Sequence, residues 1–243
     1  MKLKDIFKME MYKNRNNKPY LLVIAILTAM ASISTFLGIG MIEGKISVET
    51  LLIPLIVFTI LGLAVFSLLY PFHLLNADYQ NKVISLIFAS GVSREKYYFV
   101  KISATIISCF IAIVAVLIIP AITFLLVYPS FFVEAMQQIF KEFSFMNITS
   151  FLLMTIFSWL AYFVTLTTSV IITKGKVAGI FLFIGFSFAV SIIQSMFQVP
   201  IIVSSVLENG NINSLFYENI AFSIFQIIVF ALIGLAVLRK QDL

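Results

Sequence analysis

The side chains that most often carry catalysis or bind metals are few in this sequence. The single cysteine, Cys109, lies within an apolar run and has no second cysteine to pair with. The single histidine, His73, has no neighbouring cysteine or carboxylate in the sequence with which it could form a metal site. The Gly-Lys pairs at 44–45 and 175–176 are followed by Ile and Val, so neither completes a phosphate-binding loop. We therefore predict that the chain is not an enzyme, binds no metal or cofactor itself, and relies on another subunit for energy.

The remaining candidates are hydroxyl and amide side chains that recur along one face of otherwise apolar segments. A spacing of three or four residues places such side chains on one face of a helix. Glutamines are costly in lipid unless they meet water or protein, so those of residues 177–198 favour a polar path. Helix packing is the alternative, and it is favoured for the hydroxyl stripe of residues 151–173. The path candidates are Thr28, Ser32, Thr35, Ser187, Ser191, Gln194 and Gln198.

Apolar helices that cross a membrane must position these residues. Hydrophobic residues make up 61% of the chain and charged residues only 11%, against roughly 45–50% and 25% in soluble proteins. Several uncharged segments reach the roughly 20 residues that a span needs. Lipid leaves no partner for open backbone groups, so each is expected to be an α-helix. The predicted fold is one all-α transmembrane domain, residues 1–243, with six spans at 20–41, 51–70, 102–127, 151–173, 177–198 and 220–238.

The basic residues predict which way the chain crosses the membrane. Of the 16 Lys and Arg residues, all but Lys45 and Lys141 fall on the side that carries both ends of the chain. Positive residues mark the cytoplasmic side, so both termini are expected in the cytoplasm. We expect the protein in the cytoplasmic (inner) membrane of a bacterium. Because the positive charge is explained as a topology signal, it does not predict nucleic-acid binding.

Residues 1–19 precede the first span and have an amphipathic pattern. Leu3, Phe7 and Met11 recur every four residues, with lysines between them. This pattern predicts a short helix that lies on the lipid surface of the membrane. A basic tail that only fixes the topology is the alternative.

The uncharged stretch of residues 177–207 is too long for one crossing. A helix of that length would extend well beyond the roughly 30 Å of hydrocarbon. Pro200 is the expected break, because proline interrupts the hydrogen bonding of a helix. We therefore predict a re-entrant outer segment over residues 199–218.

The segment between the second and third spans, residues 76–101, has the pattern of a partner-binding helix. Leu86 and Ile87 belong to an apolar repeat at helical spacing, and Gly91 is a helix stop. A charged turn that starts at Arg94 then leads into the third span. A short helix held parallel to the membrane can dock into a groove of a soluble partner. The alternative is a solvated loop whose charges only set the topology.

This segment resembles the cytoplasmic coupling segment of type-2 ABC exporter permeases. In that family an acidic residue precedes an apolar helix, which is followed by a small-residue turn, Ser-Arg, and a lysine at the next span. The family more often has proline where Gly91 or Val92 stands, and glycine where Val100 stands. The matching residues are Asp78, Leu86, Ile87, Gly91, Val92, Ser93, Arg94 and Lys101.

The resemblance implies partners and roles that composition and spacing do not. It implies a second permease subunit, in a homodimer or a heterodimer, and cytoplasmic ABC ATPase subunits that bind ATP and Mg²⁺. It also implies that the matching residues couple the chain to the ATPase. In the family, spans one, two and five border the substrate path.

The six spans contain no Asp, Glu, Lys or Arg, which argues against ion-coupled transport. Their hydroxyls, amides and aromatic rings suit an apolar substrate with scattered hydrogen-bonding groups. We therefore expect export of a hydrophobic or amphipathic peptide of the bacteriocin, lantibiotic or phenol-soluble-modulin type, since small permeases of peptide export and immunity systems are similar. The alternatives are an exporter of lipophilic drugs or lipids, a non-transport immunity or scaffold protein, and a facilitative channel or carrier.

Overall fold

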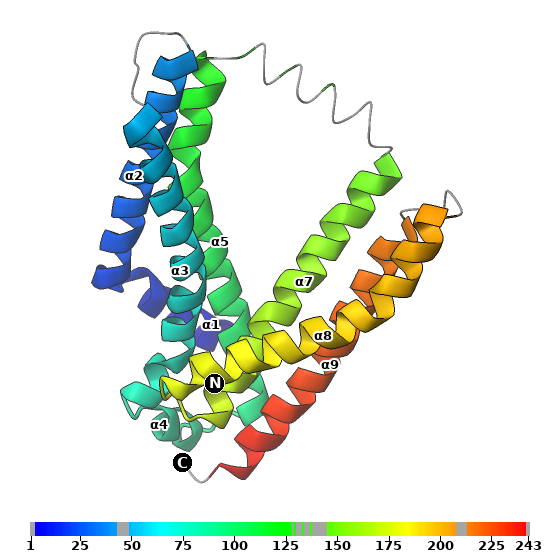
Figure 1. Cartoon of the computed structure of the whole chain (residues 1–243). Helices are drawn as coiled ribbons and strands as arrows, with labels where there is room; N and C mark the ends of the chain where they lie inside the picture. The colour runs from blue at the N-terminus through cyan, green and yellow to red at the C-terminus, as the bar shows by residue number, and fades with distance from the viewer. Residues whose placement is uncertain are drawn as a thin grey trace. The chain divides into compact units, whose positions relative to one another are not determined.

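The computed structural model of the chain is all-helical over the residues that it describes (Figure 1). These are residues 3–42, 49–127, 145–207 and 213–241, together with the single residues 129, 133 and 137. Six of the helices are long and apolar enough to cross a membrane, so the chain is a multi-pass membrane protein. The helices are α1 Leu3–Arg15, α2 Lys18–Ile42, α3 Glu49–Gln80, α4 Ile84–Ala89, α5 Arg94–Val127, α7 Phe145–Ile172, α8 Ala178–Leu207 and α9 Asn213–Lys240.

Internal contacts divide the chain into two compact units. The first unit comprises Lys2–Leu74 and Ser103–Ile139, and so contains α1, α2 and most of α3 and α5. The second unit comprises Leu75–Ile102 and Phe140–Leu243, and so contains α4, α7, α8, α9 and the adjoining ends of α3 and α5. The single domain expected over residues 1–243 therefore has two packing centres.

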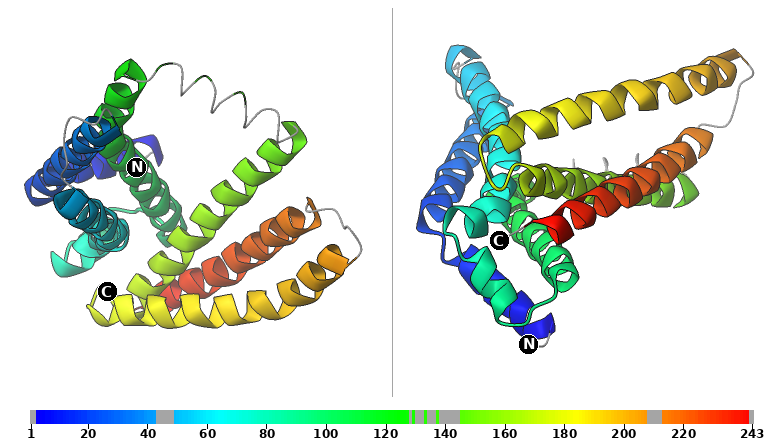
Figure 2. Two further views of the ribbon diagram at one scale, coloured as in Figure 1. Left: turned by 45° about the horizontal axis from the view of Figure 1, so that its top comes forward. Right: turned by 90° about the horizontal axis from the view of Figure 1, so that it is seen from below.

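In the first unit, α2, α3 and α5 run side by side (Figures 1 and 2). The helices α2 and α3 approach closely at Gly62, where an added Cβ would lie 2.9 Å from a methyl group of Leu27. Nearby, the hydroxyl groups of Ser34 and Thr59 lie 3.4 Å apart and link the same two helices. Small side chains and hydroxyl groups thus allow these apolar helices to pack tightly, as is usual between spans.

The N-terminal helix α1 packs through a face that the sequence pattern did not predict. A helix was expected here and is present, but its buried residues are Ile6, Glu10 and Asn14, while Leu3 is exposed. The amide of Asn14 donates to the hydroxyl of Ser108 on α5 at 2.9 Å. A hydrogen bond to a neighbouring helix therefore turns a partly polar face inward, which apolar periodicity alone cannot predict.

In the second unit, α9 lies along α7, and α8 contacts both (Figure 2). The hydroxyl of Thr168 donates to the carbonyl of Phe230 at 2.8 Å, and the amide of Gln226 donates to the hydroxyl of Thr165 at 2.9 Å. Both threonines are buried. Thr165 of the predicted hydroxyl stripe therefore joins α7 to α9, as the packing interpretation of residues 151–173 expects, and Thr168 does the same from outside that stripe.

Two helices are much longer than the spans predicted within them. The 32 residues of α3 and the 34 of α5 make helices of about 48 and 51 Å, whereas roughly 30 Å of hydrocarbon needs about 20 residues. The end of α3 and the start of α5 thus extend into the predicted coupling segment between the second and third spans, residues 76–101. In that segment only residues 81–83 and 90–93 lie outside helices.

The structure differs from the expected break at Pro200. Helix α8 continues through this residue and ends at Leu207. Residues 201–207 therefore extend α8, where a re-entrant segment over residues 199–218 was predicted. Residues 208–212, which carry the predicted turn, lie outside the described residues.

Candidate functional site

Residues 76–101 link α3 to α5, and we call them the α3–α5 connection. A buried ion pair joins the two ends of this connection and forms its base. The ammonium group of Lys101 donates to Asp78 Oδ2 at 2.7 Å, and the hydroxyl of Tyr97 donates to the same oxygen at 2.8 Å. Both charged side chains are buried. Tyr97 and Lys101 lie four residues apart on one face of α5, so together they tie the start of α5 to the end of α3. The charged groups satisfy one another, as buried charges must.

Helix α4 and the turn after it stand on this base. Helix α4 ends at Ala89 and is followed by Gly91, whose φ of +85° is the left-handed conformation that favours glycine after a helix. Val92 then turns inward and is buried, while Leu86 on α4 is 67% exposed. The ring of Phe88 meets the ring of Tyr97 edge to face, with centroids 5.4 Å apart. The connection thus presents an apolar side chain on an ordered support.

The far side of the turn is fastened to the end of α9. The guanidinium group of Arg94 donates to the carbonyl of Leu238 at 2.7 Å and also to that of Arg239. The last carbonyls of a helix lack partners within it, and a cation there complements the helix dipole. Glu95 forms an exposed ion pair with Arg239. Arg94 also lies 5.5 Å from the centre of the Phe88 ring, which connects this anchor with α4.

Further bonds attach the turn between α7 and α8 to the same cluster. The amide of Gln241 donates to the carbonyl of Ile171 at 2.6 Å and accepts from the hydroxyl of Tyr79 at 3.1 Å. Gly175 has a φ of +72°, and a Cβ there would lie 2.5 Å from the Cβ of Tyr79. The ends of α3, α7 and α9 therefore meet beside the α3–α5 connection, and glycine is needed for the closest approach.

The structure gives the predicted coupling residues two kinds of position. Asp78, Val92, Arg94 and Lys101 are turned inward or bonded to other helices, so they hold the connection in place. The outward-facing residues are Leu86, Gly91 and Ser93, with Ile87 half-buried. Sequence reasoning missed Tyr97, although its spacing from Lys101 could have indicated it. It also missed the last residues of α9, because no local pattern relates them to residues 76–101.

A second polar cluster lies on α8 and α9, toward the ends of these helices that are opposite the α7–α8 turn. The amides of Gln194 and Gln198 donate to the side-chain oxygen of Asn219 at 2.5 and 2.7 Å. Gln194 and Gln198 line a cavity of about 310 Å³ that is otherwise lined largely by phenylalanines and by Glu218. One carboxylate oxygen of Glu218 is buried and has no hydrogen-bond partner among the described residues. The cluster therefore offers buried acceptor groups beside aromatic surface.

Sequence reasoning found only half of this second cluster. Gln194 and Gln198 were predicted, and they do lie together. Glu218 was assigned to the outer segment, and Asn219 lay just before the sixth span, which was expected to begin at residue 220. Helix α9 in fact begins at Asn213 and brings both residues alongside α8.

The other path candidates do not join this cluster. Thr28, Ser32 and Thr35 lie in the first unit, and each donates its hydroxyl hydrogen to the carbonyl four residues earlier in α2. Such bonds satisfy a hydroxyl group within its own helix. On α8, Ser187 is half-buried and Ser191 is exposed.

Comparisons with known proteins identify no relative of this chain. No protein-family model, curated protein or solved structure matches this chain. Within the described part of the chain, no three His, Cys, Asp or Glu side chains come together as a group that could hold a metal ion. Function must therefore be inferred from the two clusters themselves, one that presents α4 and one that borders the α8–α9 cavity.

Proposed function

We propose that this chain is the permease subunit of an ATP-driven exporter of the ABC type. Helix α4 and the turn at residues 90–93 would be its contact with cytoplasmic ATPase subunits. The observation that carries the proposal is the position of Leu86, which is 67% exposed on a helix with anchored flanks. Exposed leucine is unfavourable in water and suits a groove in a soluble partner.

The anchoring of α4 suits the transmission of a mechanical signal. The Asp78–Lys101 pair joins α3 to α5 on one side of α4, and Arg94 joins α5 to α9 on the other. A displacement of α4 by a partner would therefore act on three membrane helices within the second unit. A solvated loop that only obeys the topology rule would need no such buried pair.

Co-purification tests this proposal. The tagged chain, extracted from native membranes, is expected to retain an ATPase, and Leu86→Asp is expected to abolish that retention. A buried or contacting leucine replaced by a charge typically disrupts an interface, whereas the anchors of α4 are untouched. Leu3→Asp is the matched control, because Leu3 is also exposed, at 54%, and lies on a different helix. If Leu86→Asp still retained the ATPase, the α3–α5 connection would be a loop whose charges only set the topology.

The contacts of Arg94 make it a poor probe of the same question. Its guanidinium group donates to the last carbonyls of α9, so reversing its charge would disturb helix packing as well as any partner contact. Leu86 makes no comparable polar bond to the end of α9. A defect in Leu86→Asp therefore reports on docking more directly than a defect in Arg94→Glu.

For the cargo, we propose a membrane-active amphipathic peptide. Support comes from the α8–α9 cavity, where phenylalanines adjoin Gln194 and Gln198, which both donate to Asn219. Aromatic walls suit apolar side chains, and amides suit peptide groups. The buried oxygen of Glu218 adds an acceptor for an amino group, which peptides carry.

Challenge of a deletion strain separates this cargo from lipophilic drugs or lipids, the main alternative. Cells without the chain are expected to lose peptide secretion and to become more sensitive to amphipathic peptides. A clear drug phenotype with unchanged peptide handling would reject the peptide assignment. An immunity or scaffold protein would change peptide sensitivity without any ATP-dependent secretion.

A further inference from the structure

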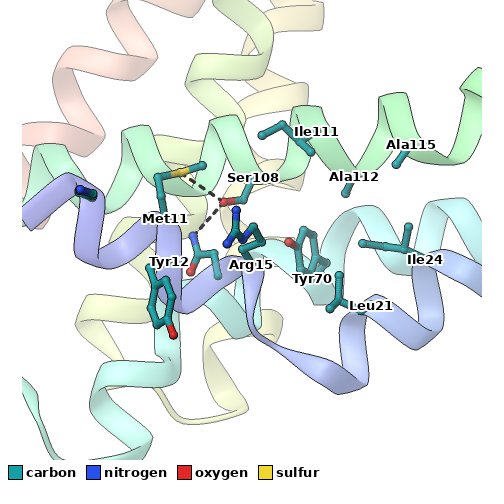
Figure 3. Close-up of a pocket in the computed structure, with 12 residues that line it drawn as sticks. Met11, Tyr12, Arg15, Leu21, Ile24, Tyr70, Ser108, Ile111, Ala112 and Ala115 are labelled. Atoms are coloured by element: carbon teal, nitrogen blue, oxygen red, sulfur yellow. Dashed lines mark hydrogen bonds between the residues drawn. The ribbon is translucent and has the colours of Figure 1, made fainter.

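A cavity of about 540 Å³ lies within the first unit, between α1 and the helices α2, α3 and α5 (Figure 3). Its volume is in the range of small-molecule sites. One wall is apolar and is formed by Leu21 and Ile24 of α2 with Ile111, Ala112 and Ala115 of α5. Leu21 and Ile111 are also half exposed on the outer surface of their helices. The apolar wall is therefore continuous with surface that faces the lipid bilayer.

Helix α1 forms the other wall and is held there by a specific bond. Asn14 and Ser108 are both buried and hydrogen-bonded at 2.9 Å, and the Ser108 hydroxyl also donates to the carbonyl of Ala104 at 2.8 Å. Ile6, two turns earlier, is almost completely buried. These contacts fix the position of α1 along α5 and its rotation about its own axis. The cavity is therefore bordered by a helix that is held in place.

Two cations of α1 line the same cavity. Lys8 and Arg15 lie seven residues apart, which is about two helical turns, so both project from one face. Neither forms an ion pair with a carboxylate in the described part of the chain, whereas Lys13 pairs with Glu10. The cavity therefore combines unpaired positive charge at α1 with an apolar wall along α2 and α5. Figure 3 shows Arg15 projecting from α1, with Ile111, Ala112 and Ala115 along α5.

We propose that this cavity binds one anionic phospholipid. Lys8 and Arg15 hold its phosphate group, and one acyl chain lies along Ile24, Ile111 and Ala115. Arginine and lysine are the side chains that bind phosphate, and basic pockets between membrane helices bind anionic headgroups. The proposal rests only on the membrane location of the chain and is independent of any ATPase or exported peptide.

A phospholipid fits this cavity better than the proposed cargo does. Two cations repel a basic amphipathic peptide but attract a phosphate group. The lateral continuity with lipid-facing surface also allows an acyl chain to enter from the leaflet without leaving the bilayer. Binding there would fasten α1 to α2 and α5, because the lipid would contact all three helices at once.

Native mass spectrometry of the full-length chain tests the proposal. The detergent-purified protein is titrated with phosphatidylglycerol or with phosphatidylcholine that has the same acyl chains. We expect one phosphatidylglycerol to remain bound under conditions that remove phosphatidylcholine. The double variant Lys8→Gln/Arg15→Gln is expected to bind phosphatidylglycerol about 25-fold more weakly, from about fivefold for each basic residue. Both side chains are exposed, so this variant is expected to fold.

Two matched controls make the result specific. Lys4→Gln/Lys18→Gln removes the same charge from exposed positions that do not line the cavity, and is expected to leave the affinity unchanged. Ala115→Phe fills the cavity and should prevent binding, whereas Ala121→Phe, on the exposed surface of α5, should not.

Three results would overturn the proposal. One is equal retention of both lipids, and another is an equal loss in the Lys4/Lys18 control. The third is stable binding of an added amphipathic peptide in place of phosphatidylglycerol, with that binding lost in Ala115→Phe.

Discussion

Replacing Asp78 by Asn removes the carboxylate charge that lies 2.7 Å from the buried ammonium group of Lys101. The amide can still accept a hydrogen bond from Tyr97, so the change is mainly electrostatic. Lys101 is 3% exposed, so water cannot readily solvate its charge once the carboxylate charge is gone. The expected result is a large loss of stability of the folded chain, with the α3–α5 connection released from its base.

The size of this loss follows from burial. Removing one partner of a buried ion pair costs about 3–5 kcal/mol. For a chain of this length, about 1 kcal/mol lowers the melting temperature by about 2–4 °C, so the loss corresponds to at least about 6 °C. Lys101→Met is expected to cost a similar amount. The double variant should cost less than the two single losses together, by on the order of 2 kcal/mol, because the residues interact directly.

Cys109 provides the assay. It is the only cysteine in the chain and is buried in the folded protein. A thiol-reactive fluorescent dye should therefore label it only as the protein unfolds, and the labelling temperature reports stability in detergent. Far-ultraviolet circular dichroism on the same samples confirms that labelling follows loss of the fold.

Glu95→Gln is the matched control for Asp78→Asn. It makes the same chemical change in the ion pair with Arg239, whose two side chains are 53% and 62% exposed. Exposed pairs contribute about 0–1 kcal/mol, so the control should melt within a few degrees of the original chain. If Asp78→Asn proved as well tolerated as Glu95→Gln, or if the double variant showed no coupling, the buried pair would not be the base of the connection.

Two further predictions concern α9. Gly234→Ala is expected to lower the melting temperature, because the new Cβ would lie 2.9 Å from the hydroxyl of Thr168 and 3.1 Å from the Tyr98 ring. Gly185→Ala is the control: nothing lies within 4 Å of the new Cβ, and alanine favours helix by about 1 kcal/mol, so this variant should be neutral or stabilising. A lower melting temperature for Gly185→Ala than for Gly234→Ala would contradict the packing of α9 on α7. Asn219→Leu removes the acceptor that Gln194 and Gln198 share and is expected to reduce peptide export about 30-fold, from two lost bonds of about 1 kcal/mol each, while ATPase retention is unchanged. Ser195→Ala is the control, because it loses only a bond within its own helix. Equal peptide export by the two variants would show that the α8–α9 cluster does not line the substrate path.

The sequence by itself determined the membrane spans and several of the points where helices end. A span must satisfy its own backbone in lipid, so a long uncharged segment has no alternative to a helix. Glycine at residue 91 likewise predicts a helix end, because a positive φ strains other residues, and the observed φ is +85°. These features depend on residues close together in the chain, and a linear pattern contains them. Pro200 is the exception, since α8 continues through it.

Only the tertiary structure decided how the polar residues are partnered. Asp78 and Lys101 lie 23 residues apart, and Arg94 lies 144 residues from the carbonyl that it caps. Asn219 likewise becomes a partner of Gln194 only because α9 begins early enough to run beside α8. A buried polar group needs some partner, but its own sequence neighbourhood does not specify which one. The partner depends on which helix ends meet in space, and that is a property of the packed chain.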